Sequence, residues 1–319
     1  MRRTLTTAAV ATLLGLAGCA SPAADSSGSP ADASKKVTVG VIPIVDVAPI
    51  YLGKEKGFFS ARGIELDLVA AQGGAAIVPG VVSGQFQFGF SNITSLMIAA
   101  SKGLPLKITC AGNSSTGKSG ADFGAVVVNA DSPIQTAKDL AGKTVSVNTL
   151  ANIGDTTVRA SVRKAGGDPD KVKFTELAFP EMPAALASKK LDAAWVVEPF
   201  LSVTKAQGAR VVAWNFVDTA PNLPVAAYFT TTKLGQDDPD LVKRFAEAMA
   251  ESSAYAQAHP DEARAVITTY TKITAEQAKS LTLPQWPATI DATALGVLAD
   301  LAVTDGLVTT KPDLAALLP

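Results

Sequence analysis

Apolar stretches of strand length alternate with stretches of helical periodicity along most of the chain. The pattern predicts strands at 37–42, 64–69, 86–90, 106–111, 126–129, 144–147 and 172–177. It predicts helices at 48–60, 75–83, 94–102, 134–140 and 155–165, and an almost wholly helical region from Pro239 onward. Strands that alternate with helices favour a mostly parallel sheet covered by helices on both faces. We therefore predict an α/β fold.

The sequence also contains a weak internal repeat. The strand Thr38–Val41 resembles Thr144–Val147, and each is followed by a polar loop and a helix. The strand Phe86–Phe90 resembles Leu191–Trp195 at nearly the same separation. Two copies of one strand–helix unit predict two similar lobes.

Two such lobes should enclose a cleft where strand carboxyl ends and helix N-termini face each other. Ligands bind at such places because helix N-termini present unpaired N–H groups with partial positive charge. The loops expected there are rich in Asn, Ser and Thr. From them we predict these ligand-binding residues: Asp46, Asn92, Thr94, Asn113, Ser114, Asn148, Thr149 and Asn152.

The charges of these loops leave two kinds of ligand open. No Lys or Arg precedes Lys118 in them, so hydroxyl and backbone N–H groups could hold a small anion. Asp46 and Glu198 favour instead a ligand with an amine or amidine, whereas we expect Asp155 to cap a helix. Glu198 follows an apolar strand, where a carboxylate is costly unless it is paired. Trp195, in that strand, is a candidate for stacking on the ligand.

Composition argues against several other functions. The formal net charge is −1, which provides no field to attract nucleic acid. One His and two Cys cannot build a His- or Cys-based metal site or a His-dependent triad, so we expect no cofactor, no metal and no enzymatic activity. Gly112–Ser119 matches the phosphate-loop pattern but leads into a strand instead of a helix, and we expect no nucleotide site there. Cys110 should be a buried, unpaired thiol.

The first residues have the features of a secretion signal. A basic start, Met1–Arg3, precedes the apolar stretch Leu5–Leu16, which is too short to span a bilayer. The sequence Leu-Ala-Gly-Cys that ends at Cys19 resembles the bacterial lipobox. We therefore predict a signal peptide at 1–18, lipidation of Cys19 and a flexible tether at 19–36. The protein would then lie at the extracytoplasmic face of a bacterial membrane, held there by its lipid alone.

Several motifs together resemble the solute-binding proteins of ABC importers in the nitrate, sulfonate, taurine and thiamine-pyrimidine group. They are Ala48–Ile64, Asp131–Ile134 running into Lys138–Val145, Leu191–Trp195, and Glu198-Pro199-Phe200. The resemblance covers essentially all of 37–319. Gln87 stands where the family usually has Asp, and the loop 148–155 lacks the Gly-Ser-Ser usual in the sulfonate binders.

The resemblance implies a two-lobed, type II periplasmic-binding-protein fold with two crossover segments. Lobe 1 would comprise 37–124 and 225–319, and lobe 2 would comprise 125–224. A monomer would close on a small polar organic solute, either sulfonate-, taurine- or nitrate-like or a heteroaromatic amine such as a pyrimidine. The closed form would dock on a permease that works with an ATPase.

Two alternatives remain open. The first is a receptor that reports ligand occupancy to a membrane partner. The second is an enzyme resembling thiamine-pyrimidine synthases, which would need a reactive His and a Lys that forms an aldimine. The chain's His259 lies at a predicted helix end, in the wrong half of the chain for that chemistry.

Overall fold

The computed structural model describes residues 34–318, and the chain from Ser34 onward forms one compact unit. The predicted signal peptide, the predicted lipidation site Cys19 and most of the predicted tether lie outside the described residues. Within 34–318, no helix is both long enough and apolar enough to cross a membrane.

The first of two five-stranded sheets has the order β2-β1-β3-β10-β4. Its strands are β1 (Lys35–Val41), β2 (Ile64–Ala70), β3 (Phe88–Asn92), β4 (Leu106–Ser114) and β10 (Pro224–Thr231). Strand β1 pairs in parallel with β2 and β3, and β10 pairs antiparallel with β3 and β4. Four strands therefore share one direction, and β10 runs against them.

The second sheet repeats this arrangement, with the order β7-β6-β8-β5-β9. Its strands are β5 (Gly124–Val128), β6 (Thr144–Val147), β7 (Lys173–Glu176), β8 (Ala193–Val197) and β9 (Arg210–Ala213). Val39 of β1 lies opposite Phe88, and Val145 of β6 lies opposite Ala193 in the same way. The internal repeat predicted from the sequence is therefore confirmed as the equivalence of β1 with β6 and of β3 with β8.

Each sheet is mixed because one strand enters it from the other. Residues 115–123 lead from β4 to β5, and residues 220–223 lead back to β10. Both of these entering strands are antiparallel to their two neighbours. The predicted α/β fold with mostly parallel sheets is confirmed, because four of the five strands in each sheet share one direction and the entering strand runs against them. All five residues of β5 are buried, and such a uniformly apolar strand carries no sign of its direction.

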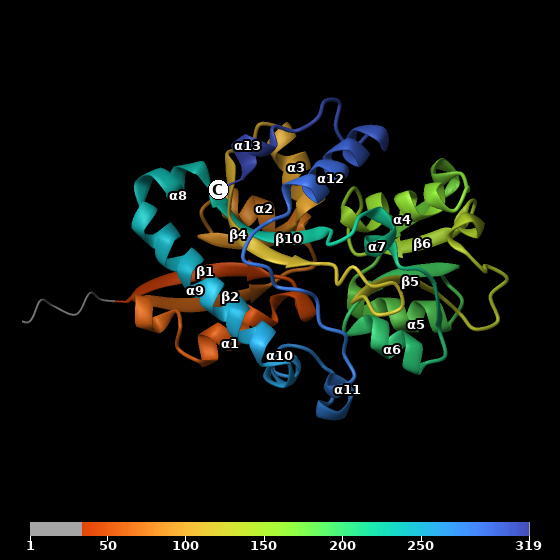
Figure 1. Ribbon diagram of the computed structural model, residues 1–319, viewed down its shortest axis with the longest axis horizontal. Coiled ribbons are helices and arrows are strands. Elements are labelled where there is room, and N and C mark those ends of the chain that lie inside the picture. Colours follow the sequence, from red (N-terminus) through yellow and green to blue (C-terminus); the bar gives the residue numbers. More distant parts are fainter. Residues whose placement is uncertain (1–33, 319) are drawn as a thin grey trace, which may run out of the picture. The chain divides into compact units, whose positions relative to one another are not determined.

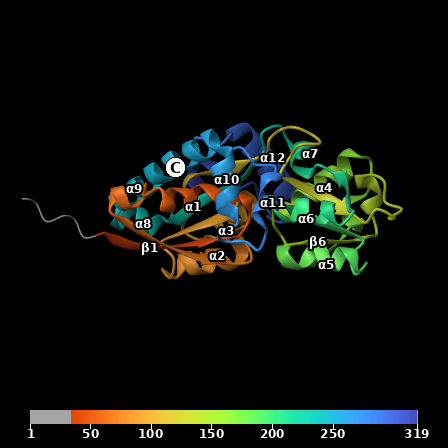
Figure 2. The same ribbon diagram turned by 90° about the horizontal axis from the view of Figure 1, so that it is seen from below.

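Helices lie on both faces of each sheet (Figures 1 and 2). Those grouped with the first sheet are α1 (Ala48–Glu55), α2 (Gly74–Val82), α3 (Ile93–Ser101), α8 (Thr232–Asp237), α9 (Pro239–Ala258), α10 (Pro260–Ile267), α11 (Ala275–Lys279), α12 (Ala292–Thr304) and α13 (Leu314–Leu317). Those grouped with the second are α4 (Ile153–Lys164), α5 (Met182–Ala187), α6 (Phe200–Ala206) and α7 (Asn215–Thr219).

Two predicted helices are shorter than expected. The helix at 48–60 ends at Glu55, and Gly57 then adopts a left-handed φ of 80° that reverses the chain. The helix at 134–140 is only one 3₁₀ turn, Ala137–Leu140, which begins with a capping box from Thr136. Strands β9 and β10 had not been predicted. Cys110 lies on β4 as a free thiol. It is half-buried, whereas the sequence had predicted a buried thiol.

Candidate functional site

A small cavity lies between the two sheets, where strand ends from both of them meet. Its volume is about 20 Å³, which is room for roughly one water molecule. Both sheets and their flanking helices contribute to its lining, which consists of Ile42, Ile44, Asp46, Phe90, Asn92, Asn148, Ile153, Phe179, Trp195, Val197, Phe216, Val225 and Ala226. We call this space the inter-sheet cavity.

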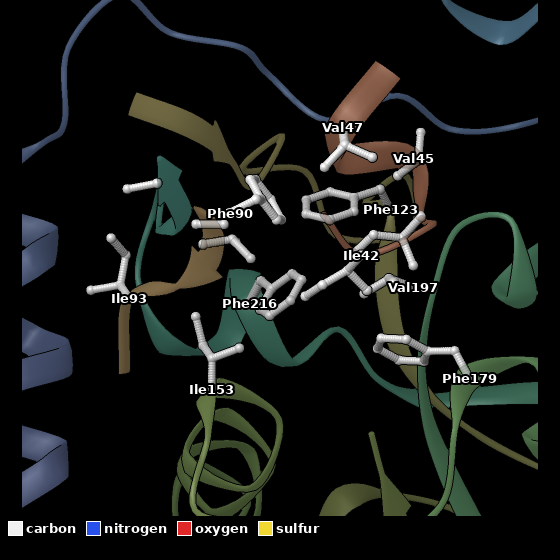
Figure 3. Close-up of a cluster of buried hydrophobic side chains, with 14 of the residues drawn as sticks. Ile42, Val45, Val47, Phe90, Ile93, Phe123, Ile153, Phe179, Val197 and Phe216 are labelled. Atoms are coloured by element: carbon white, nitrogen blue, oxygen red, sulfur yellow. The ribbon is translucent and has the colours of Figure 1, made fainter. Parts of the chain in front are cut away.

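The walls of the inter-sheet cavity are largely apolar and aromatic. Figure 3 shows Ile42 and Phe90, from the first sheet, close to Phe216 and Val197, which belong with the second. None of the lining residues is Lys, Arg or His. A wider groove of about 250 Å³ shares Ile42 and other lining residues with the cavity.

Asp46 is the acidic residue of this lining. It sits in the 3₁₀ turn Val45–Val47 after β1 and is only 2% exposed. One carboxylate oxygen, Oδ2, accepts a hydrogen bond of 2.8 Å from Asn113 Nδ2, whereas Oδ1 has no partner. Burial raises the pKa of Asp46 to about 7, and nearby Asp122 raises it further, although the bond from Asn113 opposes the shift.

Asn92 and Thr94 lie at the N-terminus of α3. Asn92 caps this helix, because its Oδ1 accepts a hydrogen bond of 2.9 Å from the Ser95 backbone N–H. Thr94 is buried, and its hydroxyl has no partner. The side chain of Asn92 is therefore partly used for capping while it also lines the cavity.

The loop before α4 satisfies most of its own polar groups. Asn152 caps α4 through a bond of 2.7 Å from Gly154 N to its Oδ1. Its Nδ2 donates to Asn148 Oδ1 and Thr149 Oγ1, each at 2.8 Å. Asp155 completes a capping box with Asn152, so its predicted role in capping this helix is confirmed. Asp155 acts from the third position of the helix, whereas the N-cap residue is Asn152.

Asn148 also reaches across to the first sheet. Its Nδ2 donates to the carbonyl of Gln72 at 3.1 Å, and Gln72 Nε2 donates to the carbonyl of Asn148 at 2.9 Å. We call this reciprocal pair the Gln72–Asn148 clasp. The next residue is Gly73, where an added Cβ would lie only 2.8 Å from Thr149 Cγ2. The two loops therefore approach more closely than a larger side chain would allow.

The carboxylate of Glu198 is satisfied by the chain itself. One oxygen accepts from Ser202 Oγ at 2.8 Å and from Thr282 N at 3.3 Å, and the other accepts from Ser202 N at 3.0 Å. Burial raises its pKa. Glu198 thus holds the start of α6 and joins it to the segment after α11.

Trp195 packs among aromatic rings, whereas Ser114 pairs with the backbone of a distant segment. The Trp195 ring lies near the rings of Phe179 and Phe216, with centroids 5.4 and 6.0 Å away, and its Nε1 has no partner. It fills the space beside Gly154, where an added Cβ would lie 2.4 Å from the indole. Ser114 instead exchanges two backbone hydrogen bonds with Gln285, at 2.9 and 3.1 Å.

The structure brings part of the predicted site together. Four predicted residues line the inter-sheet cavity, namely Asp46, Asn92, Asn148 and Trp195, and Asn113 reaches it through its bond to Asp46. The other predicted residues are absent from its lining: Thr94, Ser114, Thr149, Asn152 and Glu198. Sequence reasoning missed the apolar lining, including Phe179 and Phe216. Phe179 begins a 3₁₀ turn after β7, and Phe216 lies in α7 after β9, but apolar residues at such positions are typical of a core.

The other motifs considered from the sequence lie outside this lining. Ser115 Oγ donates to Asp122 Oδ2 at 2.6 Å, and the backbone N–H of Thr116 donates to the same carboxylate at 2.9 Å. In the part of the chain that the structure describes, β4 ends at Ser114 and the next element is the strand β5, which begins at Gly124. The segment therefore lacks the helix that a phosphate loop requires. His259 is exposed and stacks on Tyr255, with ring centroids 4.0 Å apart.

Two sheets of identical strand order, enclosing a cavity between them, define a two-lobed ligand-binding protein. Comparison with known proteins agrees with this class. The family model described as "NMT1/THI5 like" matches residues 44–263, more than half of the chain. The chain belongs to this family.

The curated relatives are binding proteins. A putative aliphatic sulfonates-binding protein of Bacillus subtilis is 25% identical over 259 residues, which cover 80% of this chain and 74% of that protein. A formylaminopyrimidine-binding protein of Halalkalibacterium halodurans is 23% identical over 225 residues, 69% of this chain and 65% of that protein. The solved alkanesulfonate-binding protein SsuA of Xanthomonas axonopodis pv. citri, bound to MOPS, has a TM-score of 0.74. It is 14% identical, and the match covers 89% of this chain and 98% of SsuA. These similarities show the periplasmic-binding-protein fold.

Asp46 should make the ligand-free protein less stable as the pH rises from 5 to 8. Its pKa of about 7 in the folded state lies above the ordinary 3.8, so folding favours the protonated acid. This contribution to stability is complete below about pH 4 and is lost as the pH rises through about 7. At about 1.4 kcal/mol per unit, roughly 2–3 kcal/mol should be lost between pH 5 and 8.

Urea denaturation of wild type and Asp46→Asn at both pH values checks this, because the amide mimics the protonated acid. The wild-type free energy of unfolding should fall relative to that of the variant. Parallel pH profiles for the two proteins would contradict the assignment.

Proposed function

We propose that this protein is the extracytoplasmic substrate-binding component of an ABC importer and captures a small organic solute between its two lobes, where the inter-sheet cavity shares lining residues with the groove of about 250 Å³. The enclosure of that cavity by equivalent elements of two similar lobes is the observation that carries the proposal. Membership in a family whose relatives bind small solutes supports it. A permease and an ATPase would be its partners, and a lipid on Cys19 would keep it beside them.

The lining of the cavity limits the solute. Apolar and aromatic walls suit a ligand with a hydrocarbon or heteroaromatic part, and a few polar groups fix its orientation. Relatives that bind aliphatic sulfonates and formylaminopyrimidine represent the two ligand classes that the family offers. Bare nitrate would leave the aromatic walls without a partner, and we place it outside the ligand range.

We further propose that the lobes open to admit the ligand and close over it. Contacts between the lobes at both ends of α4 support this mechanism. The Gln72–Asn148 clasp lies just before α4. Near the end of α4, Arg163 Nη2 forms an ion pair of 2.6 Å with Asp305 Oδ1, which follows α12. Glu198 adds two more contacts, since it accepts from the backbone N–H groups of Val45 and Thr282. A ligand that binds the closed form more tightly would shift the balance between open and closed forms by that difference in affinity.

Two alternative functions share the same cavity. A receptor that reports occupancy to a membrane sensor would also close on its ligand, and partner binding would separate it from a transport protein. Catalysis of the thiamine-pyrimidine type would place a reactive His beside the ligand. The exposed position of His259, stacked on Tyr255, favours binding over this chemistry.

The full-length protein, purified in detergent, should bind one solute per chain without converting it. Isothermal titration against aliphatic and aromatic sulfonates, taurine, aromatic amines and aminopyrimidines should give a dissociation constant below 1 mM, on the order of 10⁻³ M or tighter, for at least one class. Mass spectrometry of the recovered solute checks that it is unchanged. Turnover, or no binding by any class, would refute the proposed function.

Removing the Gln72–Asn148 clasp should favour the open form. The double variant Gln72→Ala, Asn148→Ala loses the two side-chain hydrogen bonds between the lobes, together about 1–3 kcal/mol of closure, and also the bond from Asn152 Nδ2 within its own lobe. Its radius of gyration without ligand, measured by small-angle X-ray scattering, should rise, and ligand affinity should fall about 5- to 100-fold. Gln85→Ala, at an exposed site of the same lobe, is the control. Unchanged scattering and affinity would exclude a role of the clasp in closure.

Cys19 should decide whether the protein stays with the membrane. In bacteria that express the full-length chain, wild type should sediment with membranes, and Cys19→Ser should lose the lipid and its attachment. Cys110→Ser, at the free thiol of β4, should behave like wild type. Equal mass and equal fractionation of Cys19→Ser and wild type would show that Cys19 carries no lipid.

A further inference from the structure

One buried acid has no evident structural purpose. Asp46 lines the inter-sheet cavity with an unpaired carboxylate oxygen, Oδ1. Asp305 also has an unpaired oxygen, Oδ2, but its other oxygen is held in an ion pair with Arg163 and it lies outside the cavity lining, whereas Asp46 has no cationic partner there. A buried charge without a partner destabilises a protein, and an apolar residue of similar size would serve the fold better. An acid kept at such a place therefore points to a ligand group that pairs with it.

We infer that the ligand carries a positively charged amine or amidine, which donates a hydrogen bond to Asp46 Oδ1. This inference rests on the proposed binding function and names the chemical class of the solute. An N–H donor would satisfy the unpaired oxygen, and a positive charge would compensate the buried carboxylate in a water-poor space. Asn113 fixes the other oxygen at 2.8 Å and so orients the carboxylate toward the ligand.

Among residues 34–318, the titratable groups around Asp46 supply no competing cation. Asp122, in the segment 115–123, contributes negative charge, and Tyr228 on β10 and Tyr270 after α10 are influenced by Asp46 but carry no positive charge. Tyr51 of α1, which stacks on Tyr270, is likewise uncharged. The site therefore attracts a cation and repels an anion.

This electrostatic environment separates the two ligand classes left open above. A sulfonate in the cavity would face Asp46, and no Lys, Arg or His of the lining would compensate it. A cation beside the rings of Phe90, Phe179, Phe216 and Trp195 is in a favourable setting, because aromatic faces attract positive charge. The structure thus favours an amine on an apolar or aromatic group.

Three probes that share one ring and differ in the head group test this: benzylamine, benzyl alcohol and phenylmethanesulfonate. Titration calorimetry on the full-length protein in detergent at pH 8 should show that benzylamine binds about 10- to 100-fold more tightly than benzyl alcohol. Phenylmethanesulfonate should bind most weakly. If the sulfonate binds more tightly than the amine, the inference is overturned while the proposed binding function stands. If no probe and no solute of the wider panel binds, both fail.

The Asp46→Asn variant tests the residue itself. Its preference for benzylamine over benzyl alcohol should fall to about onefold, because the amide carries no charge. The matched control is Asp122→Asn, a nearby buried acid whose oxygens already accept from Ser115, Thr116 and Phe123. It should keep the preference. An unchanged preference in Asp46→Asn, with thermal unfolding showing a folded protein, would overturn the assignment.

The pH dependence provides a readout that a structural role would not change. Alkyl amines stay protonated at pH 5 and 8, whereas Asp46 must lose its proton to pair with the ligand. Wild-type affinity for benzylamine should therefore fall about 10- to 100-fold from pH 8 to 5, and that of Asp46→Asn should not. Equal pH profiles would count against the pairing.

Discussion

The packing of apolar side chains between the two sheets is the constraint on which the rest of this structure depends. One continuous hydrophobic core joins residues of both, and Ile42 and Phe90 meet Phe216 and Val197 at the ends of the strands. Because water is largely excluded there, each polar group must find a partner within the protein or from a ligand. The loops satisfy this requirement with helix caps, backbone pairs and the Gln72–Asn148 clasp. Asp46 Oδ1 is one of several buried polar atoms without a partner, as are Thr94 Oγ1 and Trp195 Nε1, but it belongs to the acid that lines the cavity.

The internal repeat makes the position of Asp46 easier to interpret. Because β1 corresponds to β6, Asp46 after β1 corresponds to Asn152 after β6. In the second sheet this position caps α4, and the Asn152 side chain is fully occupied by Gly154, Asn148 and Thr149. In the first sheet the same position lies in a 3₁₀ turn, where it makes no cap. Of these two equivalent positions, Asn152 therefore has a structural role, whereas Asp46 has a carboxylate oxygen that is free to accept a hydrogen bond.

The sequence was sufficient for the fold class and the repeat because both depend on hydrophobic periodicity. It was less informative about the directions of β5 and β10, since fully buried strands carry no record of how they pair. For the candidate site, the reasoning from strand ends selected Asp46, Asn92, Asn148 and Trp195, which the structure places in the lining of the inter-sheet cavity. The same reasoning could not foresee that Glu198 would be used by Ser202 and Thr282, because Thr282 is distant in sequence. Nor could it distinguish Phe179 and Phe216 from ordinary core residues, since a cavity wall and a core have the same composition.

Asp46 also connects ligand chemistry to closure. In the proposed mechanism, closing the lobes would remove this carboxyl from water, which is unfavourable for its charged form and would oppose closure above about pH 7. The Gln72–Asn148 clasp and the partly exposed Arg163–Asp305 pair would together contribute a few kcal/mol to closure, about 1 kcal/mol for each interaction. A cationic ligand removes the opposing cost, whereas a neutral or anionic one does not. In the proposed mechanism, the buried acid that selects the ligand would also make the closed form depend on the ligand's charge, so that ligand selection and lobe closure would have the same electrostatic origin.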